Sequence, residues 1–141
     1  MSVGTYSPRD IELIVAGVPI RGYMSGTFIS TERNADSFSL DIGADGEAAR
    51  TASADRSGRI TLTLQQTSPS NDFLSGLIIA DELTSNAVFP VLLKDTQGRT
   101  LEASACAWLV KPANTEYSDE QSGREWMIEC ANLTKFVGGN S

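Results

Sequence analysis

The acidic residues between Asp41 and Glu47 are the first candidates for chemistry, because closely spaced carboxylates can bind Ca²⁺ in a loop. An EF-hand loop needs an oxygen ligand at its third position and a glutamate at its twelfth. Counted from Asp41, those positions hold Gly43 and Ala52, which have no side-chain oxygen. No helical pattern flanks the segment. The pattern therefore favours a turn in a β-hairpin over a calcium site.

Two cysteines, Cys106 and Cys130, are the next candidates. They lie far apart in the sequence, neither belongs to a CxxC pair, and the chain contains no histidine, so a zinc motif is missing. A reactive thiol would need a basic or helix-terminal setting, and the sequence supplies neither. We expect both thiols to be reduced, small core residues on neighbouring strands.

No motif indicates catalysis. The absence of histidine removes the commonest general base, and the sequence has no GxSxG elbow, Walker loop or dinucleotide fingerprint. The adjacent acids Asp119 and Glu120 have the residue types of a glycosidase pair, but acids in such a polar loop are far more often solvated surface. We therefore predict a protein that is not an enzyme, with no catalytic residue, no cofactor and no metal site.

The length and composition are those of one small domain. The chain has 141 residues, of which 40% are hydrophobic, so a single domain over residues 1–141 can bury a core without disulfides or metal. The formal net charge is −7 and no Lys/Arg cluster stands out, which argues against binding to DNA phosphates. The first residues lack the apolar stretch of a signal peptide, and no run has the length of a membrane span.

Alternating apolar residues in the first half predict a mainly β fold. Gly17 allows a tight turn after the first strand, and Asp45-Gly46 is the best candidate for a two-residue hairpin turn. Residues 26–31 are a further strand candidate. Three strands each have an apolar face that we expect to point into the core: Ile11, Leu13 and Val15; Phe38, Leu40 and Ile42; and Ile60, Leu62 and Leu64.

The second half predicts one helix and three strands. Either Ser68 or Ser70 can cap the start of the helix. Strands are predicted over residues 88–93, 101–110 and 124–130, and Pro90 must lie at an edge, a bulge or a strand start because it cannot donate to a ladder. We expect the helix to cover an open face or end of the strands with residues that recur at roughly helical spacing: Phe73, Leu74, Leu77, Ile78 and Leu83.

The segment from Thr31 to Arg59 mixes acidic and basic residues along a predicted long hairpin. Its second strand is rich in alanine and can bury little apolar surface by itself. One interpretation is a mobile surface hairpin. The other is an arm that docks on a neighbouring subunit through Arg–carboxylate pairs, with Arg50 and Arg56 opposite acids of the neighbour. The candidate intersubunit contacts are Glu32, Arg33, Asp41, Asp45, Gly46, Glu47, Arg50, Asp55 and Arg56.

Five blocks of sequence, in order along nearly the whole chain, resemble one known family. They are residues 2–8, 32–38, 43–47, 64–72 and 136–140. The family is that of the tail tube proteins of contractile-tailed, myovirus-type bacteriophages. The resemblance implies a mainly β tail-tube fold with one α-helix, built as a β-sandwich or split barrel with a long protruding hairpin.

The same resemblance implies a virion structural protein. Six subunits would form a ring, and the rings would stack into the inner tail tube that conducts phage DNA into the host during ejection. DNA would pass through the lumen without specific binding. The implied partners are further copies of the chain, the tail sheath protein, and the baseplate and tail terminator proteins, with no membrane. The protein would be synthesised in the host cytoplasm and reside in the virion tail.

Two alternatives stay open at this point. A tube subunit of a phage-derived contractile machine, such as a bacteriocin or a type VI secretion system, would have the same fold, and the genomic neighbourhood would decide. A monomeric carbohydrate-binding β-sandwich would need exposed aromatic residues on one face. Aromatic residues make up only 7% of this chain, and we expect most of them in the core.

Overall fold

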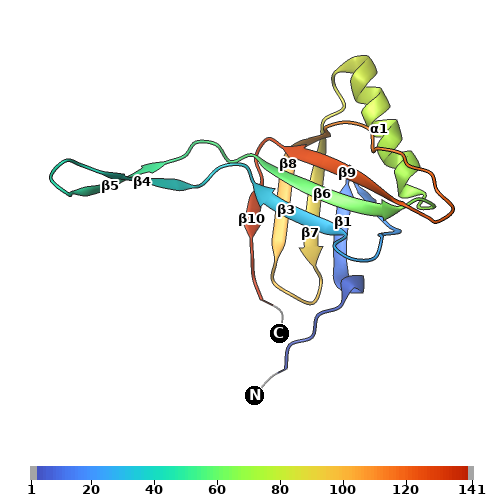
Figure 1. Ribbon diagram of the computed structural model, residues 1–141, viewed down its shortest axis with the longest axis horizontal. Helices are drawn as coiled ribbons and strands as arrows, with labels where there is room; N and C mark the ends of the chain where they lie inside the picture. The colour runs from blue at the N-terminus through green and yellow to red at the C-terminus, as the bar shows by residue number, and fades with distance from the viewer. Residues whose placement is uncertain (1–2, 140–141) are drawn as a thin grey trace.

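The computed structural model describes residues 3–139 and confirms a mainly β fold with one α-helix (Figure 1). The helix, α1, spans Ser70–Thr84, and a short 3-10 turn spans Pro8–Asp10. The strands are β1 (Ile11–Val15), β2 (Val18–Pro19), β3 (Ile29–Arg33), β4 (Phe38–Ile42), β5 (Ala48–Ala52), β6 (Gly58–Gln65), β7 (Phe89–Asp95), β8 (Leu101–Leu109), β9 (Gly123–Cys130) and β10 (Thr134–Phe136).

One continuous sheet forms the body of the protein. Its strand order is β2-β1-β7-β8-β9-β6-β3, and β10 pairs with β8. The sheet folds over, so that β3 and β6 cross β7 and β1 in Figure 1. Because hydrogen bonding runs unbroken through β8 and β9, the body is better described as a split barrel than as two separate sheets.

The core lies between the two halves of this sheet, as the alternation predicted for β1 and β6. Leu13 and Val15 of β1 are buried, and so are Ile60, Leu62 and Leu64 of β6. Each aliphatic side chain buried in this way stabilises the fold by about 1.5–3 kcal/mol. Their polar neighbours along each strand are partly exposed, which is the pattern of strands with one face on the core.

A bulge between β7 and β8 changes which side chains of β8 face the core. Phe89 pairs with Ala107 and Val91 pairs with Ser104, so β8 has one residue more than β7 between these pairs. Ala107 is buried as a result, and Cys106 is exposed. The expectation of a core thiol is therefore wrong for Cys106 and confirmed for Cys130. The prediction that Pro90 lies at an edge, a bulge or a strand start is also confirmed.

The helix begins close to the predicted position, but the expected serine cap is wrong, because the N-cap residue is Pro69, which makes no side-chain capping hydrogen bond. The apolar face is also shorter than expected. The Ser68 hydroxyl accepts a hydrogen bond from the Ser70 amide at 3.2 Å. Leu74 and Ile78 are buried against the body. Leu83, which we expected on the same face, is 80% exposed because the C-terminal half of the helix extends past the strands (Figure 1).

The hairpin of β4 and β5 protrudes from the body as a separate two-stranded sheet (Figure 1). Five residue pairs join the two strands, from Phe38–Ala52 to Ile42–Ala48. Arg33 and Gly58 still pair within the body sheet, so the arm comprises residues 34–57 and is shorter at both ends than the 31–59 expected.

Gly43–Glu47 forms the tip of the arm. The Gly43 amide donates to the Glu47 carbonyl at 2.8 Å, and the Gly46 amide donates to the Gly43 carbonyl at 2.9 Å. Gly46 has a φ of +88°, which favours glycine. The prediction that Asp45-Gly46 lies in the hairpin turn is confirmed, but the loop has more than two residues.

Candidate assembly interface

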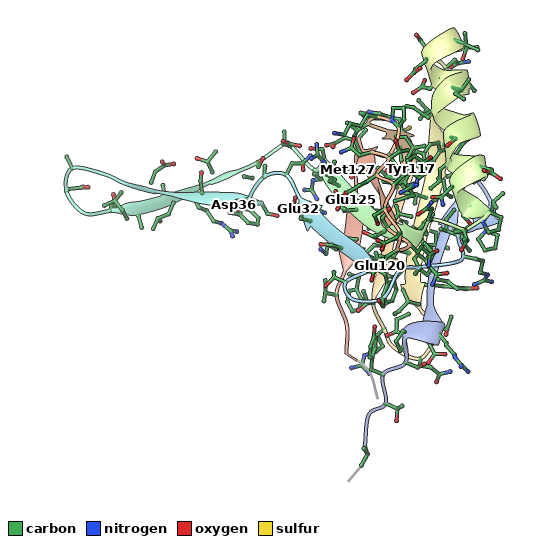
Figure 2. All side chains as sticks on the ribbon, turned by 45° about the vertical axis from the view of Figure 1, so that its right-hand side comes forward. Glu32, Asp36, Tyr117, Glu120, Glu125 and Met127 are labelled. Carbon is green, nitrogen blue, oxygen red and sulfur yellow. The ribbon has the colours of Figure 1, made fainter. Side chains whose placement is uncertain are left out.

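One face of the arm is apolar and exposed. Residues paired across two antiparallel strands point to the same face, so Phe38, Leu40 and Ile42 lie together with Ala48 and Ala52. Phe38 is 52% exposed, Leu40 69% and Ile42 60%. The expectation that these three side chains face the core is wrong, because no second layer of the protein covers the arm. Figure 2 shows the side chains of the arm standing clear of the body.

Arg50 lies at the centre of this apolar face. It pairs with Leu40 across the strands, and its guanidinium carbon lies 4.3 Å from the centre of the Phe38 ring. A cation over an exposed aromatic ring gains about 0.5–1 kcal/mol, which is enough to favour one arrangement of the two side chains. The face therefore presents a cation and a flat aromatic ring held together.

The opposite face of the arm is polar and makes its own contacts. The Thr51 hydroxyl donates to Asp41 Oδ2 at 3.0 Å, and Asp41 pairs with Ala49 across the strands. Asp41 and Arg50 consequently point to opposite faces of one arm. At the tip, Asp45 Oδ1 accepts a hydrogen bond from the Glu47 amide at 3.2 Å, so this carboxylate stabilises the turn.

Hydrogen bonds anchor the base of the arm to the body. Arg33 Nε donates to the Leu133 carbonyl at 3.0 Å. The Asn34 side-chain amide donates to Ser57 Oγ at 2.9 Å and to Glu129 Oε1 at 2.6 Å. These contacts fix the point at which the arm leaves the body.

The remaining predicted contact residues lie near the same base. Ser57 donates two hydrogen bonds to Asp55 Oδ1, from its hydroxyl at 2.7 Å and its amide at 2.9 Å, and these hold the pKa of Asp55 below its ordinary value. Arg56 is exposed and its carbonyl accepts from the Leu133 amide at 2.9 Å. Glu32 is exposed opposite Arg59. The predicted set thus divides between base, tip and the two faces of the arm, and does not form one cluster.

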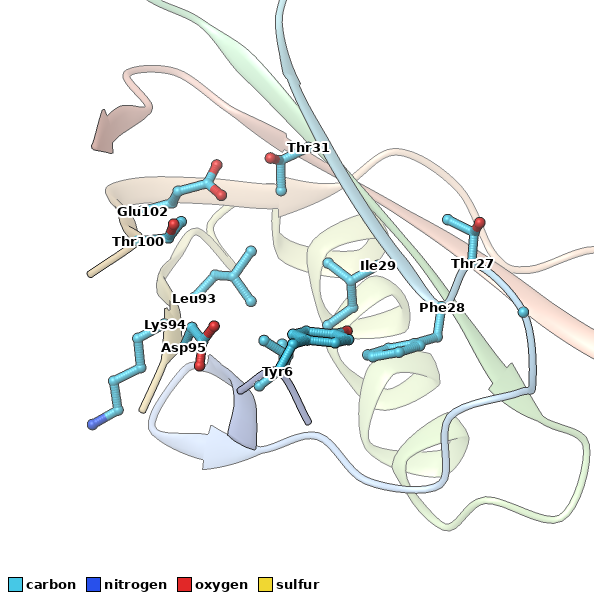
Figure 3. Close-up of a pocket in the computed structure, with 12 residues that line it drawn as sticks. Tyr6, Thr27, Phe28, Ile29, Thr31, Leu93, Lys94, Asp95, Thr100 and Glu102 are labelled. Carbon is cyan, nitrogen blue, oxygen red and sulfur yellow. The ribbon is translucent and has the colours of Figure 1, made fainter. Parts of the chain in front are cut away.

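A cleft between β3 and β7, which the sequence analysis did not identify, opens on the body (Figure 3). Its volume is about 440 Å³. The apolar part of the wall comes from Tyr6, Phe28, Ile29 and Leu93, and polar groups lie along one side. Residues of the N-terminal segment, of β3 and of β7 meet here only because the sheet folds over.

Glu102 is the unusual residue of this cleft, since its side chain is only 5% exposed. Its Oε1 atom lies 3.7 Å from Lys135 Nζ and accepts no hydrogen bond from the described residues. The Lys135 ammonium instead donates to Thr31, at 3.0 Å to the hydroxyl and 3.2 Å to the carbonyl. The sequence contained no signal for this site, because Glu102 has the position of an ordinary polar residue at the start of a strand.

Within residues 3–139, no group of three His, Cys, Asp or Glu side chains could hold a metal ion. No helix in the same range is long and apolar enough to cross a membrane.

An exposed apolar arm is a surface typical of proteins that contact other chains. The chain is a member of a phage tail tube family: the family described as "Bacteriophage PhiTE tail tube protein" matches residues 4–138. A relative named "Structural protein ORF10", from Pseudomonas phage KPP10, is 31% identical over 96% of this chain and 83% of its own length. The protein is therefore structural and not an enzyme.

Solved structures with a similar fold come from contractile injection systems. The cap of the anti-feeding prophage tube has a TM-score of 0.66 at 11% identity, covering 97% of this chain and 95% of its own. The sheath-tube complex of an extracellular contractile injection system, PVC, contains a chain with a TM-score of 0.64 at 12% identity, covering 94% of this chain and 92% of its own. At these identities the likeness shows the fold alone, and it confirms the expected tail-tube architecture.

Proposed function

We propose that this protein is the subunit of the inner tail tube of a phage with a contractile tail. As one domain spanning the whole chain, it forms homohexameric rings with copies of itself, and the rings stack into a tube that conducts DNA during ejection. The observation that carries the proposal is the arm, whose apolar face is exposed in the single chain and whose base is hydrogen-bonded to the body. Removing an apolar surface of this kind from water is favourable, and contact with another chain would achieve this.

The charge of the protein fits a conduit for DNA. The chain has 18 acidic and 11 basic residues, and it offers no basic cluster for phosphate. Phosphates passing an acidic wall would be repelled and would not stick. The sheath, the baseplate and the tail terminator are the further partners we propose, since the similar folds come from sheath-tube and tube-terminating assemblies. The protein would be made in the host cytoplasm and act in the virion tail.

Negative-stain microscopy and light scattering of the purified protein test this function. We expect rings of six subunits or stacked tubes as the concentration rises. A chain that stays monomeric at every concentration would overturn the proposal. The tube of a phage-derived machine would give the same images, so the genes beside this one decide between the two: capsid and DNA-packaging genes are expected for a phage.

A further inference from the structure

We propose that the pocket between α1, β9 and the connection from β8 to β9 is a binding site for a carboxylate group, which the guanidinium of Arg124 holds. The carboxylate belongs either to a small organic acid or to an acidic side chain of a second copy, since both present the same chemistry. The inference goes beyond the proposed tube function and does not depend on it, because the whole site lies within one chain.

The pocket lies where separate segments of the chain meet. Its volume is about 410 Å³, within the range of protein sites that bind small molecules. The connection from β8 to β9 runs alongside α1 and forms one wall (Figure 1). The side chains that matter for binding come from α1, the connection and β9, in that order: Asn71 and Ser75, Thr115 and Tyr117, and Arg124 and Trp126.

Arg124 brings a positive charge into this pocket without a negative partner. The residue is only 7% exposed, yet it forms no ion pair within residues 3–139. Its Nη1 atom donates to Ser122 Oγ at 2.9 Å, and its guanidinium carbon lies 5.3 Å from the centre of the Tyr117 ring. Neither partner is charged, and a buried charge without a partner of opposite sign costs free energy. An anion in the pocket would offset part of that cost.

The other polar groups of the pocket favour a ligand that accepts hydrogen bonds. The amide oxygens are already engaged, since Asn71 Oδ1 accepts from Trp126 Nε1 at 3.0 Å and Gln66 Oε1 accepts from the Ser122 amide at 3.2 Å. The Thr115 hydroxyl makes no hydrogen bond with the described residues and is available as a donor. Engaged acceptors and available donors together select an acceptor from outside.

A carboxylate fits these groups better than a phosphate. A guanidinium has five N–H donors in one plane, and two of them can bind both oxygens of a carboxylate. Among the described residues that line the pocket, only Arg124 is charged. It neutralises a singly charged carboxylate, whereas a phosphate with a charge near −2 would keep an uncompensated negative charge. Pro112 and Trp126 offer apolar wall for a short carbon chain.

Two variants at one exposed position test the site. Thr115→Asp places a carboxylate on the wall of the pocket, where it competes with the ligand for Arg124. Thr115→Asn is the matched control, because asparagine has the same size without the charge. Thr115 is exposed, so we expect both variants to have circular dichroism spectra like that of the unmodified protein. Arg124→Gln removes the guanidinium itself, and the pair at Thr115 carries the test if that buried substitution unfolds the chain.

The measurement is tryptophan fluorescence of the dilute protein titrated with sodium propionate at pH 7, because Trp126 lines the pocket. Propionamide, the uncharged analogue, and sodium chloride are the control solutes. We expect a saturable change with propionate alone, with a half-saturation at least about tenfold higher in Thr115→Asp and nearly unchanged in Thr115→Asn. Equal responses to propionate and propionamide, or an unchanged half-saturation in Thr115→Asp, would overturn the inference while the tube function stands.

Microscopy in saturating propionate separates the two sources of the carboxylate. Loss of tubes in propionate and in Thr115→Asp, but not in propionamide or in Thr115→Asn, would assign the carboxylate to a second copy. Normal tubes in all four cases would assign it to a small organic acid, and the binding site is supported either way. A chain that binds propionate and never assembles would overturn the tube function alone.

Discussion

Reversing the charge of Arg50 should stop assembly without unfolding the chain. Within one subunit the guanidinium contacts the Phe38 ring at 4.3 Å on an exposed surface, an interaction of about 0.5–1 kcal/mol. Because the arm has no contact with the core around Leu62, Arg50→Glu should lower the stability of the monomer by no more than about that amount.

The cost in the assembly is larger. Removing one partner of a desolvated charge pair between subunits costs about 2–5 kcal/mol, which corresponds to a loss of about thirtyfold or more in each association step. The introduced glutamate adds repulsion if its neighbours are acids. Since the contact repeats in every subunit, the penalty recurs along a tube.

The assay combines circular dichroism, urea unfolding and microscopy of Arg50→Glu. Arg9→Glu is the control, because it makes the same change in net charge at an exposed site on the body. We expect a folded Arg50→Glu protein that forms no tubes and an Arg9→Glu protein that does. Normal tubes from Arg50→Glu would show that Arg50 is not an assembly residue. An unfolded variant would show that the arm belongs to the core of the monomer, against the division made here.

Three further outcomes can be measured on the same protein. With a net charge of −7, it should not retard duplex DNA in a mobility-shift assay at physiological salt, and tight, salt-sensitive binding would contradict a smooth conduit. Leu62→Ala should lower the free energy of unfolding by about 2–5 kcal/mol in urea, because Leu62 is fully buried, whereas Leu83→Ala should change it little. Burial raises the pKa of the Cys130 thiol from 9.0 to about 11, so the contribution of this thiol to the free energy of unfolding is constant below pH 9 and is lost as the pH rises to 11. Cys130→Ala should therefore make the stability fall less steeply between these pH values. A thiol reagent should label Cys106 alone in the native state.

Local sequence patterns were sufficient to predict most of the strands of the body and its helix. The alternation at Ile60, Leu62 and Leu64 identifies a strand and its buried face, because side-chain direction in a strand is set by its own backbone. The start of α1 was predicted close to its position for the same reason, since serine and proline favour a helix start locally, although the N-cap residue is Pro69 and makes no side-chain capping bond. The type of fold and the absence of a catalytic motif followed from such short-range information.

Alternation of apolar residues did not predict burial where the burial of a strand face depends on which other segments pack against it. Phe38, Leu40 and Ile42 alternate as clearly as the residues of β6, yet they are exposed in the single chain. An amphipathic strand has one apolar face that is more stable when it is buried. Whether another segment of the same chain packs against that face depends on the arrangement of the other elements. Among the described residues none does, so this face of the arm stays exposed in the single chain.

The tertiary structure alone decided the positions of Cys106 and Glu102. Cys106 is exposed because β8 has an extra residue relative to β7, and a register between strands is not visible in either strand by itself. Glu102 is buried because β3 folds over β7 and β8 and Lys135 approaches from β10. Burial and hydrogen-bond satisfaction are properties of segments brought together from distant parts of the chain. The sequence therefore determined where most strands lie, and only the folded sheet determined which faces of β4 and β8 are covered and where the cleft forms.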